Sequence, residues 1–188
     1  MAERLGVPEL RPSTSGALPH MVTLKNGSEV PIRRAEPEDS RMLFSMFSSV
    51  SDDTMFRRFH RRSQKAVTEA DAQEMLRLDD RDVTSLTAIV RKDHTEQAVG
   101  EACYVTNSSG ELAEAEVVIA DEWQNLGLGT ALFTDLLAEA KRAGVSKVIA
   151  YFDVENGAVI HLGQKFGFKL APKEIRPDYS MLKAEITI

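Results

Sequence analysis

Hydrophobic residues recur along this chain with two different periods, which separate strands from helices. Runs that alternate apolar and polar positions, or are rich in β-branched residues, predict strands over 83–90, 98–105, 112–120, 145–152, 168–170 and 180–188. Apolar residues three and four positions apart predict helices over 53–59, 69–78, 129–142 and 156–166, and an earlier helix that opens at 35–39. Gly144 follows the 129–142 helix where a left-handed backbone commonly ends a helix.

A short hairpin is expected near the beginning of the chain. Residues 22–24 and 30–33 flank Asn26-Gly27, a dipeptide that favours tight hairpin turns. Pro31 lacks a backbone N–H, which predicts that its strand lies at the edge of a sheet.

The order of these elements predicts a mixed α/β fold. Three consecutive strands joined by short turns favour antiparallel pairing, and the later strand-helix-strand unit favours one parallel pair. We expect about six to seven strands and about four helices in one domain over 21–188. Residues 1–20 hold three prolines, two glycines and two serines without periodicity, and we interpret them as an extended arm or tail.

The composition is typical of a soluble globular protein, with 43% hydrophobic and 28% charged residues. The net charge of −6 argues against nucleic acid or an anionic membrane as the main partner, and is compatible with a basic substrate. The N-terminal region has no apolar stretch long enough for a signal peptide or a membrane span. With a single cysteine in the chain, which rules out an internal disulfide, we expect a cytoplasmic location.

Cysteine and histidine usage predicts neither a disulfide nor a metal site. Cys103 is the single cysteine and lies in an apolar run, so we expect a packed strand residue. The four histidines show no metal-ligand spacing; they are His20, His60, His94 and His161.

The segment 117–130 carries the clearest chemical signal. Its sequence VVIADEWQNLGLGT joins the end of a strand, a short loop and the glycine-containing start of a helix. Gly127 and Gly129 allow a ligand to approach the backbone closely, and the first amides of a helix bind anions. These features predict an anion site that suits a pyrophosphate.

Two other nucleotide motifs do not fit this segment. A P-loop needs a lysine before its serine or threonine, whereas Gly129 precedes Thr130 directly. A dinucleotide-binding fingerprint needs glycine or alanine where this chain has Leu132. A glycine pair that serves only helix packing remains the alternative to a binding site.

The motif Gln124-x-x-Gly127-x-Gly129, with the strand before it, resembles the pyrophosphate-binding motif A of the GNAT acetyltransferases. Asn156, followed by Phe166-Gly167-Phe168, resembles motif B of the same family. The resemblance spans about residues 22–188, with both motifs in the family's order and spacing. It implies the GNAT fold, whose sheet splays apart where acetyl-CoA binds, and acetyl transfer to an amine without a metal.

The resemblance also implies roles for individual residues. Main-chain amides would hold the pyrophosphate of coenzyme A, and they belong to Gln124, Asn125, Leu126, Gly127, Leu128, Gly129 and Thr130. The main chain of Val117, Val118 and Ile119 would pair with the pantetheine arm as an extra strand would, and Asn156 would contact the same arm. An amide near Ile119 would stabilise the oxyanion. Asn125 replaces the family's frequent glycine.

An amine acceptor needs a base, because a lysine with a pKa near 10.4 is neutral in only about one molecule in a few thousand at pH 7. In lysine-acetylating relatives a glutamate on the strand before motif A has this role, and Glu114 stands at the matching position. Glu116 has the same side-chain parity on the strand and is the alternative. Glu122 lies too close to the loop to be a good candidate for the base.

Within the family, the chain most resembles bacterial protein-lysine acetyltransferases. The supporting segments are residues 32–39, Arg57-Arg58-Phe59 and Ala113-Glu114. The basic cluster 57–62 either meets the phosphates of a ligand or forms a solvated, salt-bridged face. A small amine as acceptor is the alternative substrate, and a non-catalytic sensor of acyl-CoA is the alternative function.

One position departs from the family pattern. Many members carry a tyrosine seven residues after the motif B asparagine, which protonates the departing thiolate, and this chain has Gly163 there. Protein-lysine relatives often lack that tyrosine too. Tyr104 and Tyr151 lie in predicted strands, and neither is expected to replace it.

Overall fold

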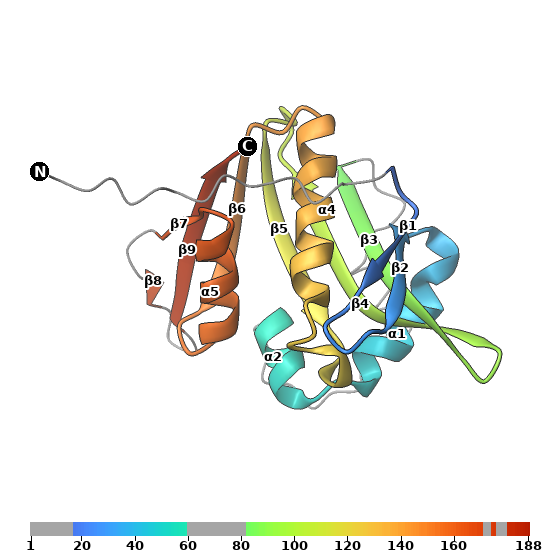
Figure 1. Ribbon diagram of the computed structural model, residues 1–188. Coiled ribbons are helices and arrows are strands. Elements are labelled where there is room, and N and C mark those ends of the chain that lie inside the picture. The colour runs from blue at the N-terminus through green and yellow to red at the C-terminus, as the bar shows by residue number, and fades with distance from the viewer. Residues whose placement is uncertain (1–16, 60–81, 171–173, 176–179) are drawn as a thin grey trace, which may run out of the picture.

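A nine-stranded sheet forms the centre of the molecule (Figure 1). The computed structural model describes residues 17–59, 82–170, 174–175 and 180–188. The strand order is β1-β2-β3-β4-β5-β6-β9-β7, and β8 also pairs with β9. The strands are β1 (His20–Thr23), β2 (Glu29–Arg34), β3 (Val83–Lys92), β4 (Thr95–Thr106), β5 (Leu112–Ile119), β6 (Lys147–Asp153), β7 (Lys169–Leu170), β8 (Glu174–Ile175) and β9 (Ser180–Thr187).

The predicted mixed sheet is confirmed: β5 and β6 run parallel, and the other pairs are antiparallel. The strand count exceeds the expected six to seven: β7 lies in the predicted strand 168–170, whereas β8, with only two residues, has no counterpart among the predicted strands. A two-residue strand such as β8 shows no period in a sequence.

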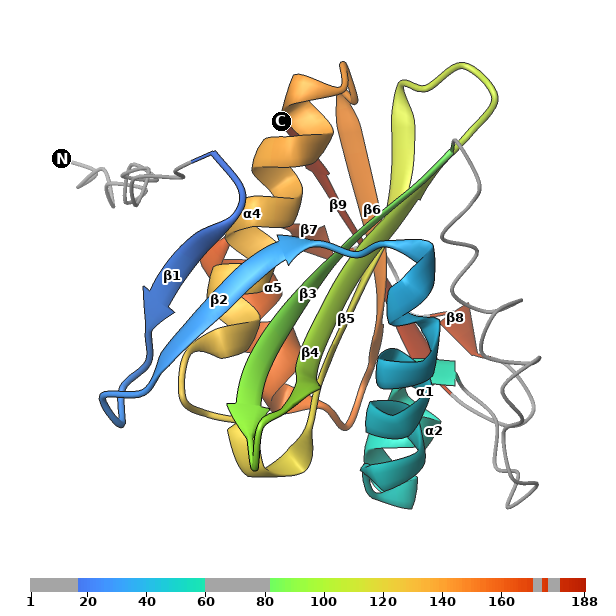
Figure 2. The ribbon, with the colours of Figure 1, turned by 90° about the vertical axis from the view of Figure 1, so that its right-hand side faces the viewer.

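Helices cover both faces of the sheet, with α4 (Leu128–Arg142) and α5 (Gly157–Lys165) on one face and α1 (Ser40–Ser49) and α2 (Asp52–Phe59) on the other (Figures 1 and 2). Short 3-10 helices precede α1 at Pro37–Asp39 and follow β5 at Asp121–Trp123. The helix predicted over 69–78 lies outside the described residues, as does most of the predicted arm.

The hydrophobic core has two parts, one on each side of the sheet. The larger part joins the sheet to α4, which contributes Leu128, Leu132, Phe133, Leu136 and Ala140. The smaller part packs Leu43, Met46 and Phe47 of α1 against Ala98 and Val118. Each fully buried large aliphatic or aromatic side chain stabilises the fold by about 1.5–3 kcal/mol. Because side chains alternate along a strand, neighbouring residues of β5 contribute to the two different parts of the core and face helices on opposite sides of the sheet.

The sheet divides between β5 and β6. These strands pair only through Leu112–Lys147, Ala113–Val148 and Glu114–Ile149, although β5 continues to Ile119 and β6 to Asp153. Beyond Glu114, β5 remains paired with β4, and β6 remains paired with β9. The right-handed twist of each half carries the two strands apart, and this opening positions the site described below.

The hairpin at the beginning of the chain forms as predicted, but Pro31 does not mark an edge strand. β2 lies between β1 and β3, and its pairing with β3 covers only Ile32–Arg34. The Ala35 N–H donates to Ser85 O at 2.9 Å, so odd-numbered residues of β2 direct their peptide groups toward β3. The missing N–H of Pro31 therefore faces a stretch where β3 makes no pair with β2.

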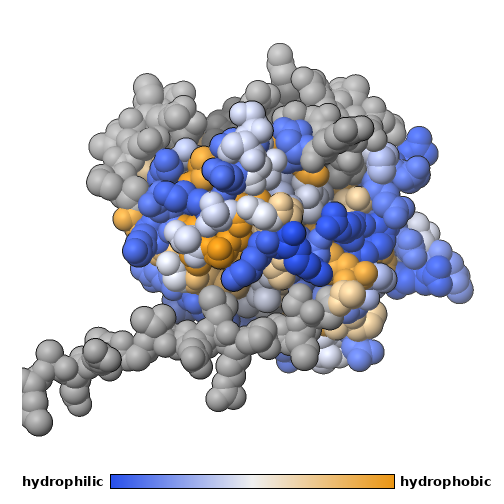
Figure 3. Space-filling view, turned by 90° about the horizontal axis from the view of Figure 1, so that it is seen from above, coloured by the Kyte–Doolittle hydropathy of each residue, from blue (hydrophilic) through white to orange (hydrophobic). Residues whose placement is uncertain are grey.

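The face of the molecule seen from above is mostly polar where it is described (Figure 3). Seen from above, hydrophobic side chains appear only in small patches between polar ones (Figure 3). No helix within the described ranges is both long and apolar enough to cross a membrane.

An ion pair fixes the start of α1 against the sheet. Arg33 of β2 donates to both carboxylate oxygens of Asp39, at 2.6 and 2.7 Å, and the Glu36 N–H donates to Asp39 at 2.8 Å. Burial raises the pKa of Asp39, but the hydrogen bonds from Arg33 and Glu36 outweigh burial and leave this pKa below its ordinary value.

We predict that Asp39→Asn lowers the free energy of unfolding at pH 7 by about 1.5–3 kcal/mol, since a buried charged hydrogen-bond partner is lost. A depressed pKa contributes stability that is present above the ordinary value of 3.8 and is lost as pH falls through the folded value. Urea unfolding of wild type and variant should therefore converge below about pH 4. Glu38→Gln, which changes an exposed acid in the same turn, is the control; an equal loss in both variants would contradict the assignment.

Candidate functional site

The opening between β5 and β6 forms a cavity of about 1110 Å³. Its walls come from residues 114–119 of β5 and 150–153 of β6, with contributions from α2, α5 and the loop before α4. Every site residue predicted from the sequence lines this cavity except Leu126 and Leu128. Leu128 is fully buried and Leu126 packs against the core, so only their main chains are left to meet a ligand.

The β5 edge of the cavity presents main-chain groups that no neighbouring strand pairs. The Ala120 N–H donates to Val99 O at 3.0 Å, and the Leu112 carbonyl accepts from Asn107 at 2.9 Å. Both even-numbered residues thus face β4, and peptide groups alternate along a strand. Among the three residues predicted to pair with an extended ligand, Val117 and Ile119 face the opening, whereas Val118 faces β4.

Two residues with positive φ shape the loop before α4. Gly127 has φ 98° and Asn125 has φ 60°. Asparagine is among the few residues other than glycine that adopt this conformation readily, which accounts for Asn125 at a position where relatives often have glycine.

The start of α4 supplies hydrogen-bond donors to the cavity. The first bond within the helix runs from the Ala131 N–H to Gly127 O at 3.1 Å, and no side chain caps this end of α4. The amides of residues 128–130 precede that bond, at the positive end of the helix dipole. Gly129 and Thr130 line the cavity, so these amides can bind an anion there.

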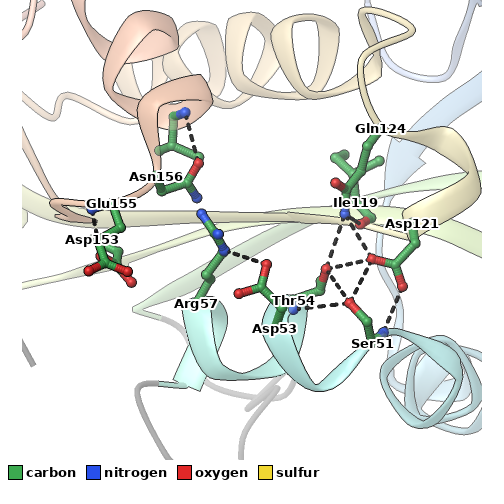
Figure 4. Close-up of polar contacts among 11 residues, drawn as sticks. Ser51, Asp53, Thr54, Arg57, Ile119, Asp121, Gln124, Asp153, Glu155 and Asn156 are labelled. Carbon is green, nitrogen blue, oxygen red and sulfur yellow. Dashed lines mark hydrogen bonds and ion pairs between the residues drawn. The ribbon is translucent and has the colours of Figure 1, made fainter. Parts of the chain in front are cut away.

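Asp121 joins this loop to α2 through hydrogen bonds that sequence reasoning missed (Figure 4). Its carboxylate accepts from the Ser51 N–H at 2.6 Å, the Ser51 hydroxyl at 3.0 Å and the Thr54 hydroxyl at 2.6 Å. The Gln124 side chain donates to Thr54, Asp121 and the Ile119 carbonyl at 3.1–3.2 Å. The side chain of Gln124, the first residue of the motif, therefore stabilises the loop through hydrogen bonds to α2 and to the end of β5.

The Asp121 carboxylate is stabilised as an anion. Burial raises the pKa of Asp121, but the hydrogen bonds from Thr54 and Ser51 outweigh burial, so the net pKa lies below its ordinary value. Ser51 and Thr54 lie about 70 positions from Asp121 in the chain, and no local pattern connects them.

Lys25 is a second residue that the sequence did not indicate. It lies in the turn between β1 and β2, where its N–H donates to Leu126 O at 3.0 Å and its ammonium to Asn125 O at 3.3 Å. Lys25 lines the cavity beside Gly127, so a positive charge stands next to the amides of α4.

On the far side of the cavity, Asn156 begins α5. Its side-chain oxygen accepts from the Val159 N–H at 3.2 Å, which leaves the side-chain NH₂ group to reach a ligand. Arg57 of α2 extends toward Asn156 across the opening (Figure 4). The Arg57 Nε donates to Asp53 at 2.7 Å. Of the rest of the basic cluster, Arg58 lies in α2, whereas His60, Arg61 and Arg62 lie outside the described residues.

Glu114 and Glu116 lie on the face of β5 that α1 covers, because Val118 has the same parity and packs against α1. Glu114 is exposed at the last level where β5 and β6 pair, opposite Ile149. Glu116 is half-buried, and its carboxylate lies 4.0 Å from the sulfur of Cys103. Cys103 is buried in β4, as predicted. Within the described ranges, no group of three or more potential ligands could hold a metal.

Comparisons with known proteins agree on one family. Residues 47–168 match the model of the Acetyltransferase (GNAT) family. An acetyltransferase of Pseudomonas aeruginosa is 27% identical over 146 residues, which is 78% of each chain. The GNAT domain of S. lividans PAT superposes with a TM-score of 0.77 at 18% identity, covering 90% of this chain and 97% of that domain. A ribosomal-protein-alanine N-acetyltransferase from Brucella melitensis superposes with a TM-score of 0.67 at 22% identity, covering 84% and 99%.

We predict that Asp121→Ala loosens the loop and α2 together, because both depend on the same carboxylate. Hydrogen exchange of peptides covering 51–59 and 121–130 should accelerate about tenfold, equivalent to about 1.4 kcal/mol of local stability. Glu122→Ala, at the exposed neighbouring acid, should leave both peptides unchanged. Equal protection in wild type and Asp121→Ala would show that the carboxylate does not hold these segments together.

Proposed function

Because the chain belongs to the GNAT family of acetyltransferases, we propose that it transfers the acetyl group of acetyl-CoA to the side-chain amine of a lysine on a protein. The enzyme class and the GNAT fold follow from the family match and the structural neighbours. The acceptor and the residue roles are our inference. The observation that carries the proposal is the opening between β5 and β6, which ends at the amides of α4.

The cavity suits the two chemically distinct parts of coenzyme A. The pantetheine arm contains amides, and the open edge at Val117 and Ile119 offers main-chain partners for them, as an adjacent strand would. The pyrophosphate carries negative charge, and Gly129, Thr130 and Lys25 bring amides and an ammonium to one end of the cavity. We assign the loop 124–130 to the pyrophosphate and the NH₂ group of Asn156 to the pantetheine arm.

A lysine side chain suits the opposite face of the cavity. Glu114, Glu116 and Asp153 line it there, and their charges favour a cationic acceptor, whereas the charge of Asp53 is paired with Arg57. The resemblance of residues 32–39 and 57–59 to protein-lysine acetyltransferases supports the same acceptor. The structural relative from Brucella melitensis is a ribosomal-protein-alanine N-acetyltransferase, so the fold accommodates a protein acceptor.

We assign the general base to Glu114, with Glu116 as the alternative. Either carboxylate would take a proton from the lysine ammonium, directly or through a water, and the neutral amine would then attack the thioester carbon. The developing oxyanion would accept a hydrogen bond from the amide of Ile119, one of the β5 residues whose peptide groups face the opening.

The proposal is tested first by calorimetric titration of the protein with acetyl-CoA. A mixture of proteins and a mixture of polyamines are then each incubated with the enzyme and acetyl-CoA and analysed by mass spectrometry. Binding with new acetyl-lysines on proteins would support it. Binding with acetylation of polyamines alone would replace lysine by a small amine as acceptor. Binding without transfer would indicate an acyl-CoA sensor, and no binding would overturn the proposed cosubstrate.

For the base, we predict that Glu114→Gln lowers kcat about a hundredfold and leaves the Kd of acetyl-CoA within about twofold of wild type. The isosteric amide keeps the volume of the side chain but accepts no proton. Glu116→Gln is the matched variant on the same face, and a larger effect there would move the role to Glu116. Unchanged kcat in both variants would exclude both glutamates as the base.

For the loop, we predict that Gly127→Val raises the Kd of acetyl-CoA at least about tenfold, equivalent to about 1.4 kcal/mol. A β-branched residue does not tolerate φ 98°, so the loop must move away from its binding geometry. Gly110→Val is the control, because Gly110 has φ 75° in a distant turn and an equally open surrounding. The control should lose stability yet bind normally; normal binding by folded Gly127→Val would contradict the assignment of the loop.

A further inference from the structure

Acetyl transfer needs a second proton step, at sulfur. The amine nitrogen forms a bond to the thioester carbon, the C–S bond breaks, and its electron pair leaves on sulfur. A free thiol has a pKa near 8.5, so a thiolate can leave unaided, but a positioned acid lowers the barrier. We propose that the phenol of Tyr151 gives its proton to this sulfur, an inference that rests on the proposed acetyl transfer.

The register of the sheet places Tyr151 beside the opening. Glu114 and Ile149 form the last pair between β5 and β6. Two residues farther along each strand come Glu116 and Tyr151, which both line the cavity where the strands separate. They stand at the same level on opposite sides of the gap through which an extended ligand would pass.

Tyr151 also projects to the same face of the sheet as the candidate bases. Val148, Ala150 and Phe152 of β6 are buried in the core on the α4 and α5 side. Side chains alternate along a strand, so Tyr151 projects to the other face, which is the face of Glu116. Tyr151 is half-buried there, partly shielded from water but open to the cavity.

The helix α5 offers no acid at the position where many relatives have a tyrosine. A Cβ atom at Gly163 would lie 2.5 Å from Cε2 and 2.7 Å from Cζ of Phe152, which is too close for any side chain. Phe152 is itself buried against Phe168, with ring centroids 6.1 Å apart. The packing that places Phe152 in the core thus leaves no room for a side chain at position 163. It also directs Tyr151, the neighbour of Phe152 in β6, toward the cavity.

The other proton donors that line this part of the cavity either have hydrogen-bond partners already or lie on the other face of the sheet. The Thr54 hydroxyl donates to Asp121, and the Arg57 guanidinium is paired with Asp53. His161 and Lys165 line the cavity from α5, on the opposite face of the sheet from Glu116. Tyr151 remains as a neutral O–H donor on the face of the base.

The protons balance without a further reactant. One proton of the lysine ammonium passes to the glutamate, which afterwards releases it to water, and sulfur takes the phenol proton as the C–S bond breaks. The new amide nitrogen loses its extra proton to water, and the tyrosinate regains a proton from water in the open cavity. The products are an acetylated lysine and the free thiol of coenzyme A.

The test compares Tyr151→Phe with wild type on acetyl-CoA and on its selenoester analogue. The variant loses only a hydroxyl, so we expect kcat with acetyl-CoA to fall about tenfold to a hundredfold while the Kd of acetyl-CoA stays within about threefold of wild type. A selenolate leaves without needing a proton, so the selenoester should restore the variant to within about threefold of wild type. Tyr104→Phe removes a phenol hydroxyl from the buried core and serves as the control, with kcat unchanged for both donors.

Each outcome bears on the assignment. An unchanged kcat in Tyr151→Phe overturns it, and so does an equal loss with both donors, which would indicate a positioning role. A rise in Kd without loss of kcat assigns Tyr151 to binding and also overturns it. Failure of wild type to transfer acetyl from acetyl-CoA overturns the proposed function and this inference together, so wild type is measured first.

Discussion

The limited pairing of β5 with β6 is the constraint on which the site depends. Each strand is paired along its length with its outer neighbour, so the sheet remains continuous at one end and open at the other. The opening exposes an edge in the middle of the sheet, where unpaired peptide groups would otherwise be unfavourable. A ligand with its own amides can satisfy them, so the feature that weakens the sheet also creates the proposed binding site.

The surrounding elements hold this opening in one shape. Asp121 connects the loop before α4 to α2, and Gln124 fixes the same loop to the end of β5. Lys25 attaches the turn between β1 and β2 to the loop from the other side. Three segments far apart in the chain thus fix the backbone whose amides face the cavity, which is the preorganisation that catalysis by electrostatic stabilisation requires.

The cavity is bordered by different chemical groups on the two faces of the sheet. On the α4 and α5 side, helix amides and α5 border the part of the cavity suited to a phosphate-bearing ligand. On the α1 and α2 side, Glu114, Glu116 and Tyr151 border the part suited to an amine. The opening connects the two sides, so a cosubstrate entering from one face can present its reactive carbon to an acceptor on the other.

The sequence alone determined the fold class, most element boundaries and the segment that forms the loop, since these depend on local periodicity and on glycine chemistry. It also indicated Cys103 as a buried strand residue. The tertiary structure decided what depends on contacts between distant segments: the place of β2 inside the sheet, the Asp121 network and Lys25. It also placed Tyr151 on the cavity-facing side of β6, which no signal in the sequence indicated. The packing of neighbouring residues, here Phe152 against α5, determines to which face of the sheet a strand residue projects. The register between two parallel strands cannot be deduced from the sequence of either strand alone.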